Sequence, residues 1–156
     1  MISPNHRAKA FSLIEVTFAM GVAAICLLAV SALLTVGVQT NKRSTSQNIA
    51  TNILAAAVAD LHAMPKVPFG QAPTAASPLF GIPPLGATPP LFFDMNGIQT
   101  NVAAEQYYRL TVTTTNSGVT APTYAWFQIT WPAIINPDTG TPEGSVEASA
   151  MCDLHY

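Results

Sequence analysis

Residues 10–38 read AFSLIEVTFAMGVAAICLLAVSALLTVGV, and this stretch decides the fold. From Val16 to Val38 it holds 23 consecutive residues without a charge, 18 of them apolar. A helix rises about 1.5 Å per residue, so a segment of this length crosses a hydrocarbon layer about 30 Å thick. The stretch therefore predicts a transmembrane helix over residues 11–38.

The residues before this helix indicate which side of the membrane they occupy. Residues 1–10 form a short polar leader with Arg7 and Lys9 and no acid, as is typical of a segment that stays in the cytoplasm. Lys42 and Arg43 follow the helix, so the basic side chains balance and only the N-terminal amine favours this orientation. We expect a single-pass protein with a cytoplasmic N-terminus and its head outside the cytoplasm.

One acid, Glu15, lies at the start of the apolar stretch. A carboxylate in the first turns of a membrane helix costs about 2–3 kcal/mol unless it has a partner. Glu15 is therefore a candidate functional residue. The alternative is a residue at headgroup level with ordinary solvation.

The segment Ala10-Phe-Ser-Leu-Ile-Glu-Val16, after a basic leader and before an apolar run, resembles the cleavage and methylation signature of type IV pilins and type II secretion pseudopilins. The resemblance implies that the protein lies in the inner (cytoplasmic) membrane, where a membrane-embedded prepilin peptidase cuts between Ala10 and Phe11 and methylates the new amine of Phe11. It also implies that Glu15 is the acid needed for filament assembly. The family usually has glycine where this chain has Ala10, and the signature covers about 30 of the 156 residues.

Within this family the chain is most similar to the Verru_Chthon cassette protein B group. The similarity rests on five short motifs: Phe11-Ser-Leu-Ile-Glu15, Val58-Ala-Asp-Leu61, Tyr108-Arg-Leu-Thr-Val112, Thr130-Trp-Pro132 and Gly144-Ser-Val-Glu147. The resemblance implies a structural subunit, not an enzyme. Its partners would be the prepilin peptidase, the membrane, and other pilin-like or pseudopilin subunits that bind through the N-terminal helix. The subunit would be extracted into a periplasmic or surface filament.

Elementary electrostatics supports this mode of assembly. An amine on Phe11 and a carboxylate on Glu15 are each costly in lipid, but they neutralise each other when they come from neighbouring subunits. Small residues at Ala19, Gly21, Ala23 and Gly37 would permit close approach of membrane helices. Alanine and glycine are also common in any membrane helix.

Three other interpretations stay open. The chain could be a type II secretion pseudopilin at a filament tip, or an exported domain that uses the signal only as a membrane anchor. It could also be a secreted protein with an ordinary signal peptide, cut near Ala29-Val30-Ser31 so that the mature chain begins near Ala32.

Beyond the membrane, the sequence predicts a small head. Ile49, Ile53, Ala57 and Leu61 repeat every four residues, which predicts an amphipathic helix over 39–64 that continues the membrane helix and ends at Pro65. We expect this stripe to pack in the head. Its polar neighbours should lie on wetter faces; they are Asn48, Thr51, Asn52 and Asp60.

The rest of the chain divides into an irregular loop and a sheet. Residues 65–90 contain eight prolines in 26 residues, which predicts an irregular wrap with partial packing. In the β head at 91–156, β-branched and aromatic residues predict strands over 107–115 and 124–131, with a third over 145–151. The expected fold is α+β and pilin-like, a long helix packed on a small antiparallel sheet.

Composition and side-chain chemistry argue against several functions. Only 9% of the residues are charged, and the six basic ones do not cluster, so no nucleic-acid partner is expected. The three histidines, His6, His62 and His155, lack the companions for a catalytic or metal site, and no cofactor is predicted. The loop with Asp138 and Glu143 is expected to be a plain surface loop rather than a calcium site.

Overall fold

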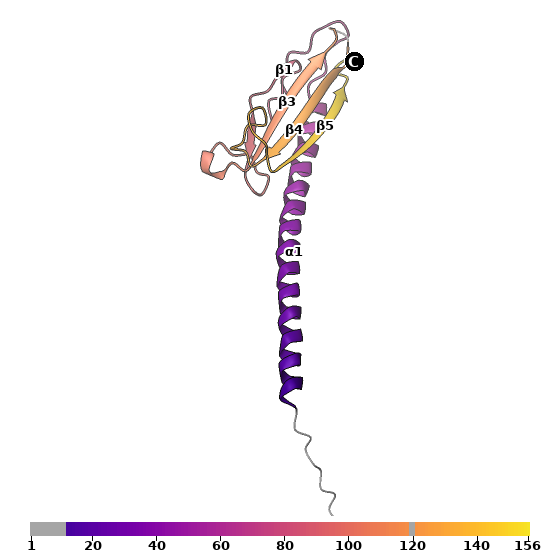
Figure 1. The fold of residues 1–156 in the computed structure, drawn as a ribbon. Coiled ribbons are helices and arrows are strands. Elements are labelled where there is room, and N and C mark those ends of the chain that lie inside the picture. The colour runs from indigo at the N-terminus through magenta and orange to yellow at the C-terminus, as the bar shows by residue number, and fades with distance from the viewer. Residues whose placement is uncertain (1–11, 119–120) are drawn as a thin grey trace, which may run out of the picture. The chain divides into compact units, whose positions relative to one another are not determined.

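The computed structural model describes residues 12–118 and 121–156, as Figure 1 shows. The elements in chain order are helix α1 (Leu13–His62), strands β1 (Gly86–Ala87) and β2 (Leu91–Phe93), a short 3-10 helix η1 (Ala103–Glu105), and strands β3 (Tyr108–Asn116), β4 (Thr123–Trp131) and β5 (Gly144–Cys152). The chain falls into two compact units, Met1–Arg43 and Ser44–Tyr156. The expected α+β class is confirmed.

Helix α1 satisfies the hydroxyl groups of its apolar part. It contains no proline, and the hydroxyls in its apolar part donate to carbonyl oxygens one turn earlier. Thr17 Oγ1 donates to the oxygen of Ile14 at 2.9 Å, and Ser31 Oγ donates to that of Leu27 at 2.8 Å. Such back-bonding leaves no free hydroxyl donor at these positions, which suits a helix in lipid.

The sheet is antiparallel, with strand order β1-β3-β4-β5, and β2 also pairs with β3. Val112 of β3 lies opposite Phe127 of β4, which in turn lies opposite Ala148 of β5. The expected hairpin and third strand are confirmed, and each strand begins and ends within one residue of the expected position. The expectation of no regular structure over 65–90 is wrong at Gly86–Ala87, which pair with Thr114 and Thr113 of β3.

The core of the second unit lies between the sheet and the C-terminal part of α1. Ile53, Ala57 and Leu61 are buried as the stripe predicts, and they belong to one cluster with Phe127 and Ile129. Burying a large aliphatic or aromatic side chain stabilises a fold by about 1.5–3 kcal/mol. Alternate residues of β3 and β4 face this core, so the helix supplies the cover for one sheet face.

The expectation that Asp60 lies on a wetter face is wrong. Its side chain is 5% exposed, and its carboxylate accepts hydrogen bonds from the backbone N–H groups of Leu79 and Phe80, both at 2.8 Å. The hydroxyl of Ser77 donates to the same carboxylate. A buried carboxylate is tolerated when hydrogen bonds replace its hydration, so Asp60 holds the proline-rich loop on the helix.

This loop is ordered, as its recurring apolar residues predict. Ile82 is fully buried, and its carbonyl oxygen accepts a hydrogen bond from the N–H of Ser77 at 2.9 Å. Gly81 has a positive φ of 64°, a conformation that glycine adopts without strain, and so turns the chain between them. Phe69 and Leu85 stay exposed, so the packing is partial.

Candidate functional site in the N-terminal helix

The first unit presents an apolar surface with nothing covering it in the described residues. Every residue from 12 to 45 is exposed, and large side chains such as Phe18 and Leu33 are more than 70% exposed. Helix α1 is long and apolar enough to cross a membrane. Exposed apolar surface of this extent marks a contact with lipid or with partner helices.

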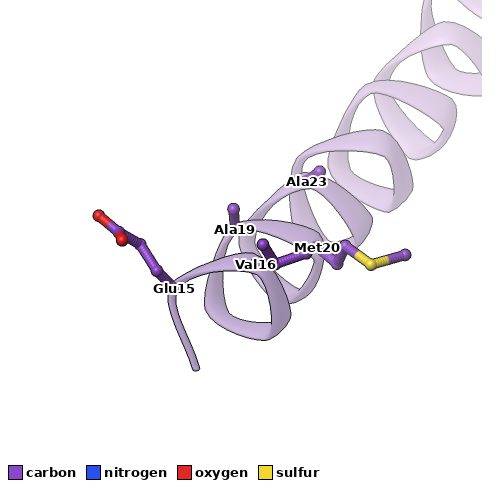
Figure 2. Close-up of a pocket in the computed structure, with 5 residues that line it drawn as sticks. All are labelled: Glu15, Val16, Ala19, Met20 and Ala23. Carbon is purple, nitrogen blue, oxygen red and sulfur yellow. The ribbon is translucent and has the colours of Figure 1, made fainter. Parts of the chain in front are cut away.

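Glu15 lies in the first turn of α1, where its N–H donates to the carbonyl oxygen of Ser12 at 3.0 Å. Figure 2 shows its carboxylate pointing away from the helix axis. Within residues 12–118 and 121–156, no hydrogen bond or ion pair engages this carboxylate. Among the described residues, Glu15 is therefore an acid without a partner at the beginning of an apolar helix.

Small side chains lie beside this acid. Ala19 and Ala23 follow Glu15 at four-residue intervals and share its face of the helix, next to Val16 and Met20 (Figure 2). The alanines leave room for a second helix to approach closely, within reach of the carboxylate.

Gly21 and Gly37 are the other small residues singled out by the sequence. A Cβ built at either position would meet nothing within 4 Å in the described chain. Neither glycine is therefore needed for packing inside this protein. A requirement for them would have to come from a neighbouring helix.

The remaining predicted site residues, Ala10 and Phe11, lie outside the described residues. Cleavage between them and methylation of Phe11 stay predictions. The basic pair after the apolar stretch, Lys42 and Arg43, is exposed.

The other candidate chemistry does not come together in the parts of the chain that the structure covers. Asp60 is buried while His62 is exposed, and no group of three histidine, cysteine or acidic side chains gathers to hold a metal in residues 12–118 and 121–156. Asp138 and Glu143 are exposed in their loop, as expected.

His155 has a structural environment that the sequence does not reveal. It is buried, its Nε2 lies 3.2 Å from the carbonyl oxygen of Gln71, and its Nδ1 lies 3.3 Å from a carboxylate oxygen of Asp153. Both ring nitrogens face acceptors, so the ring links the C-terminal segment to the loop that follows α1.

No known protein family, no curated protein and no solved structure matches this chain. The architecture, an N-terminal apolar helix followed by a small antiparallel sheet, is pilin-like.

The sequence alone did not predict two features of the second unit. One is the set of hydrogen bonds by which the buried carboxylate of Asp60 holds the proline-rich loop. Its only signal in the sequence is an acid inside the apolar repeat of a helix. The other is the open edge of β5. Its signal is a run, Gly144 to Cys152, that lacks proline and basic residues.

Proposed function

We propose that this chain is a prepilin-like structural subunit, a minor pilin or pseudopilin, of a type IV pilus-like or type II secretion filament. A prepilin peptidase cuts it between Ala10 and Phe11 and methylates Phe11. The observation that carries the proposal is the carboxylate of Glu15, which has no partner among the described residues and lies at the start of the exposed apolar part of helix α1.

The helix then assembles by charge neutralisation. The amine of Phe11 on one subunit meets the carboxylate of Glu15 on its neighbour, which removes the cost of leaving either charge alone in lipid. Ala19 and Ala23, on the same face as Glu15, let the helices come close enough for this pairing. The protein acts as a structural part rather than as a catalyst.

This proposal also sets the location of the protein. The helix crosses the inner membrane once, with the leader in the cytoplasm and the unit Ser44–Tyr156 outside it. Assembly draws the helix out of the lipid into the filament, where neighbouring subunits cover its apolar residues.

Glu15 provides the test. In cells that make the filament, Glu15→Ala and Glu15→Gln should both be inserted and cut normally, with a mature N-terminus at N-methylated Phe11 in intact-mass analysis. Both should lose co-purification with other pilin-like subunits. Glu143→Gln, which removes an exposed acid of the head, is the matched control and should assemble normally. Normal assembly of the Glu15 variants would refute the filament role.

The same mass measurement distinguishes the alternatives. A mature terminus near Ala32 would mean an ordinary signal peptide and a secreted protein. Correct processing at Phe11 with no co-assembling subunit would leave a membrane-anchored domain that uses the signal only as an anchor.

A further inference from the structure

The sheet of the second unit has one open edge, formed by β5. This strand pairs with β4 without interruption from Gly144 opposite Trp131 to Cys152 opposite Thr123, and Figure 1 shows it outermost in the sheet. Of the backbone hydrogen bonds made outside helices and strands in the described chain, none involves residues 144–152. The outer N–H and C=O groups of a nine-residue strand are thus free to pair.

The opposite edge is formed by two very short strands, of which β2 is covered. There β1 has two residues and β2 has three, and the chain after β2 folds back over it. The N–H of Thr100 donates to the carbonyl oxygen of Phe92 at 2.9 Å, and Gln99 bridges to Phe93. On this side β2 is therefore covered by its own chain and β1 offers only two residues, whereas β5 presents nine residues on the other side.

Edge strands are usually protected against pairing by proline, lysine, a bulge or a covering segment. The β5 strand has no proline, no basic residue and no break in register. Its inward side chains, Val146, Ala148 and Ala150, pack on the core but remain partly exposed. The apolar core is therefore only partly covered along this edge.

We propose that the edge of β5 binds an extended segment of a different protein as an added antiparallel strand. Apolar side chains at alternate positions of that segment cover Val146, Ala148 and Ala150. A basic side chain on its other face pairs with Glu147, which is the only charged residue of β5. Main-chain hydrogen bonds along the edge supply affinity, and this alternating pattern supplies specificity.

The placement of Glu147 favours a basic partner. Its carboxylate projects from the outer face and accepts a hydrogen bond from Nε2 of Gln128 at 2.9 Å, on the neighbouring strand. This contact orients the carboxylate, and its second oxygen accepts no hydrogen bond from the described residues. Opposite charges directly across a strand pair are stabilising, while like charges are destabilising.

Charge also argues against a second copy of this chain as the occupant. Two β5 strands paired antiparallel about Ala148 would bring two Glu147 carboxylates onto one face with no base between them. Two copies of this chain would have to pair β5 with β5, because β5 is the only long edge strand among the described strands.

A synthetic peptide tests the proposal on the full chain in detergent micelles. The probe has nine residues, with threonine at odd positions, valine at even positions and lysine at the centre. Its control has glutamate at the centre. Hydrogen exchange read by mass spectrometry should show that the lysine peptide protects the amides of β5 and leaves those of β3 unchanged.

Charge reversal sharpens the test. Glu147→Lys should weaken binding of the lysine peptide by about three- to fivefold and strengthen binding of the glutamate peptide by a similar factor. Asp138→Lys, the same change in charge away from the strand, should alter neither. Equal binding of both peptides to every variant, or no protection of β5, would overturn the proposal. Protection of β5 that rises with protein concentration alone would overturn it too, because the occupant would be a second copy.

This inference is independent of filament assembly. Glu15→Ala should bind the lysine peptide as the unchanged protein does, so the two proposals fail separately.

Discussion

The indole of Trp131 lies over the Cα of Gly144, its partner across strands β4 and β5. A Cβ at this glycine would overlap ring atoms of the indole, so the first residue of β5 must lack a side chain. We expect Gly144→Ala to lower the free energy of unfolding by about 1–3 kcal/mol, the usual cost of overpacking. Urea denaturation followed by tryptophan fluorescence measures this. Gly118→Ala, where a Cβ meets nothing within 4 Å, is the control and should change stability little.

Because the carboxylate of Asp60 holds the proline-rich loop by hydrogen bonds, we expect the stability of the protein to fall on isosteric replacement of this residue. The N–H of Leu79 donates to one oxygen of Asp60 and the N–H of Phe80 donates to the other, so replacing either oxygen by NH₂ in Asp60→Asn leaves one of these donors without its acceptor. The expected loss of stability is about 1–3 kcal/mol. Thermal unfolding compares it with Asp138→Asn, an exposed acid whose change should have almost no effect. Equal stability of the two variants would show that the hydrogen bonds to Asp60 do not stabilise the loop on the helix.

Two carboxylates with lowered pKa values, those of Asp94 and Asp153, predict an acid-dependent contribution to stability. The N–H of Ile98 chiefly lowers the pKa of Asp94 below its ordinary 3.8, and the N–H of His155 chiefly lowers the pKa of Asp153. Because both folded-state pKa values lie below those of the unfolded chain, the stabilisation is present above the unfolded pKa and is lost as pH falls through the folded one.

The urea midpoints of the unchanged protein and of the Asp94→Asn, Asp153→Asn double variant should therefore differ at pH 6 and converge on acidification toward about pH 2. A constant difference across this range would show that the two asparagines act through something other than charge.

Burial of Cys152 predicts slow thiol chemistry. Burial raises the pKa of this thiol, and the charge of Lys66 opposes the rise only in part. In a Cys26→Ser background, maleimide should react with folded protein at least about tenfold more slowly than with the urea-unfolded chain, since the thiolate is the reactive form. Lys66→Ala should slow the folded reaction further, and a faster reaction would contradict the role of Lys66.

Much of the fold follows from periodicity in the sequence. Alternation along 107–115 and 124–131 predicts which residues face the core, and the buried Tyr108, Leu110 and Val112 confirm it. The four-residue repeat from Ile49 to Leu61 likewise predicts the covering face of α1. These patterns succeed because one face of each element is buried and the other is not.

The features that the sequence did not predict depend on distant partners. Aspartate is a residue type that usually lies on the surface. The hydrogen-bond donors that allow Asp60 to be buried lie 17 to 20 residues further along the chain in a proline-rich loop. Strands β1 and β2 are too short to show a period, and they pair only because β3 offers them an edge. For the candidate assembly site, the structure shows that Glu15 and the small residues Ala19 and Ala23 share one face of α1, while their role in assembly stays a prediction and the cleavage pair lies outside the described residues.

Residues 154–156 pair through backbone hydrogen bonds with the segment that follows helix α1. Leu154 is almost fully buried, its carbonyl oxygen accepts a hydrogen bond from the N–H of Val67 at 2.8 Å, and the N–H of Tyr156 donates to the carbonyl oxygen of Val67 at 3.2 Å. Val67 lies shortly after α1, which ends at His62, so residues 154–156 pair with the segment that follows the helix. This contact can form only after the segment that contains Leu154 has been synthesised. A chain truncated before Leu154 would keep α1 but lose this contact, so the segment after the helix would open more readily and become a site of proteolysis.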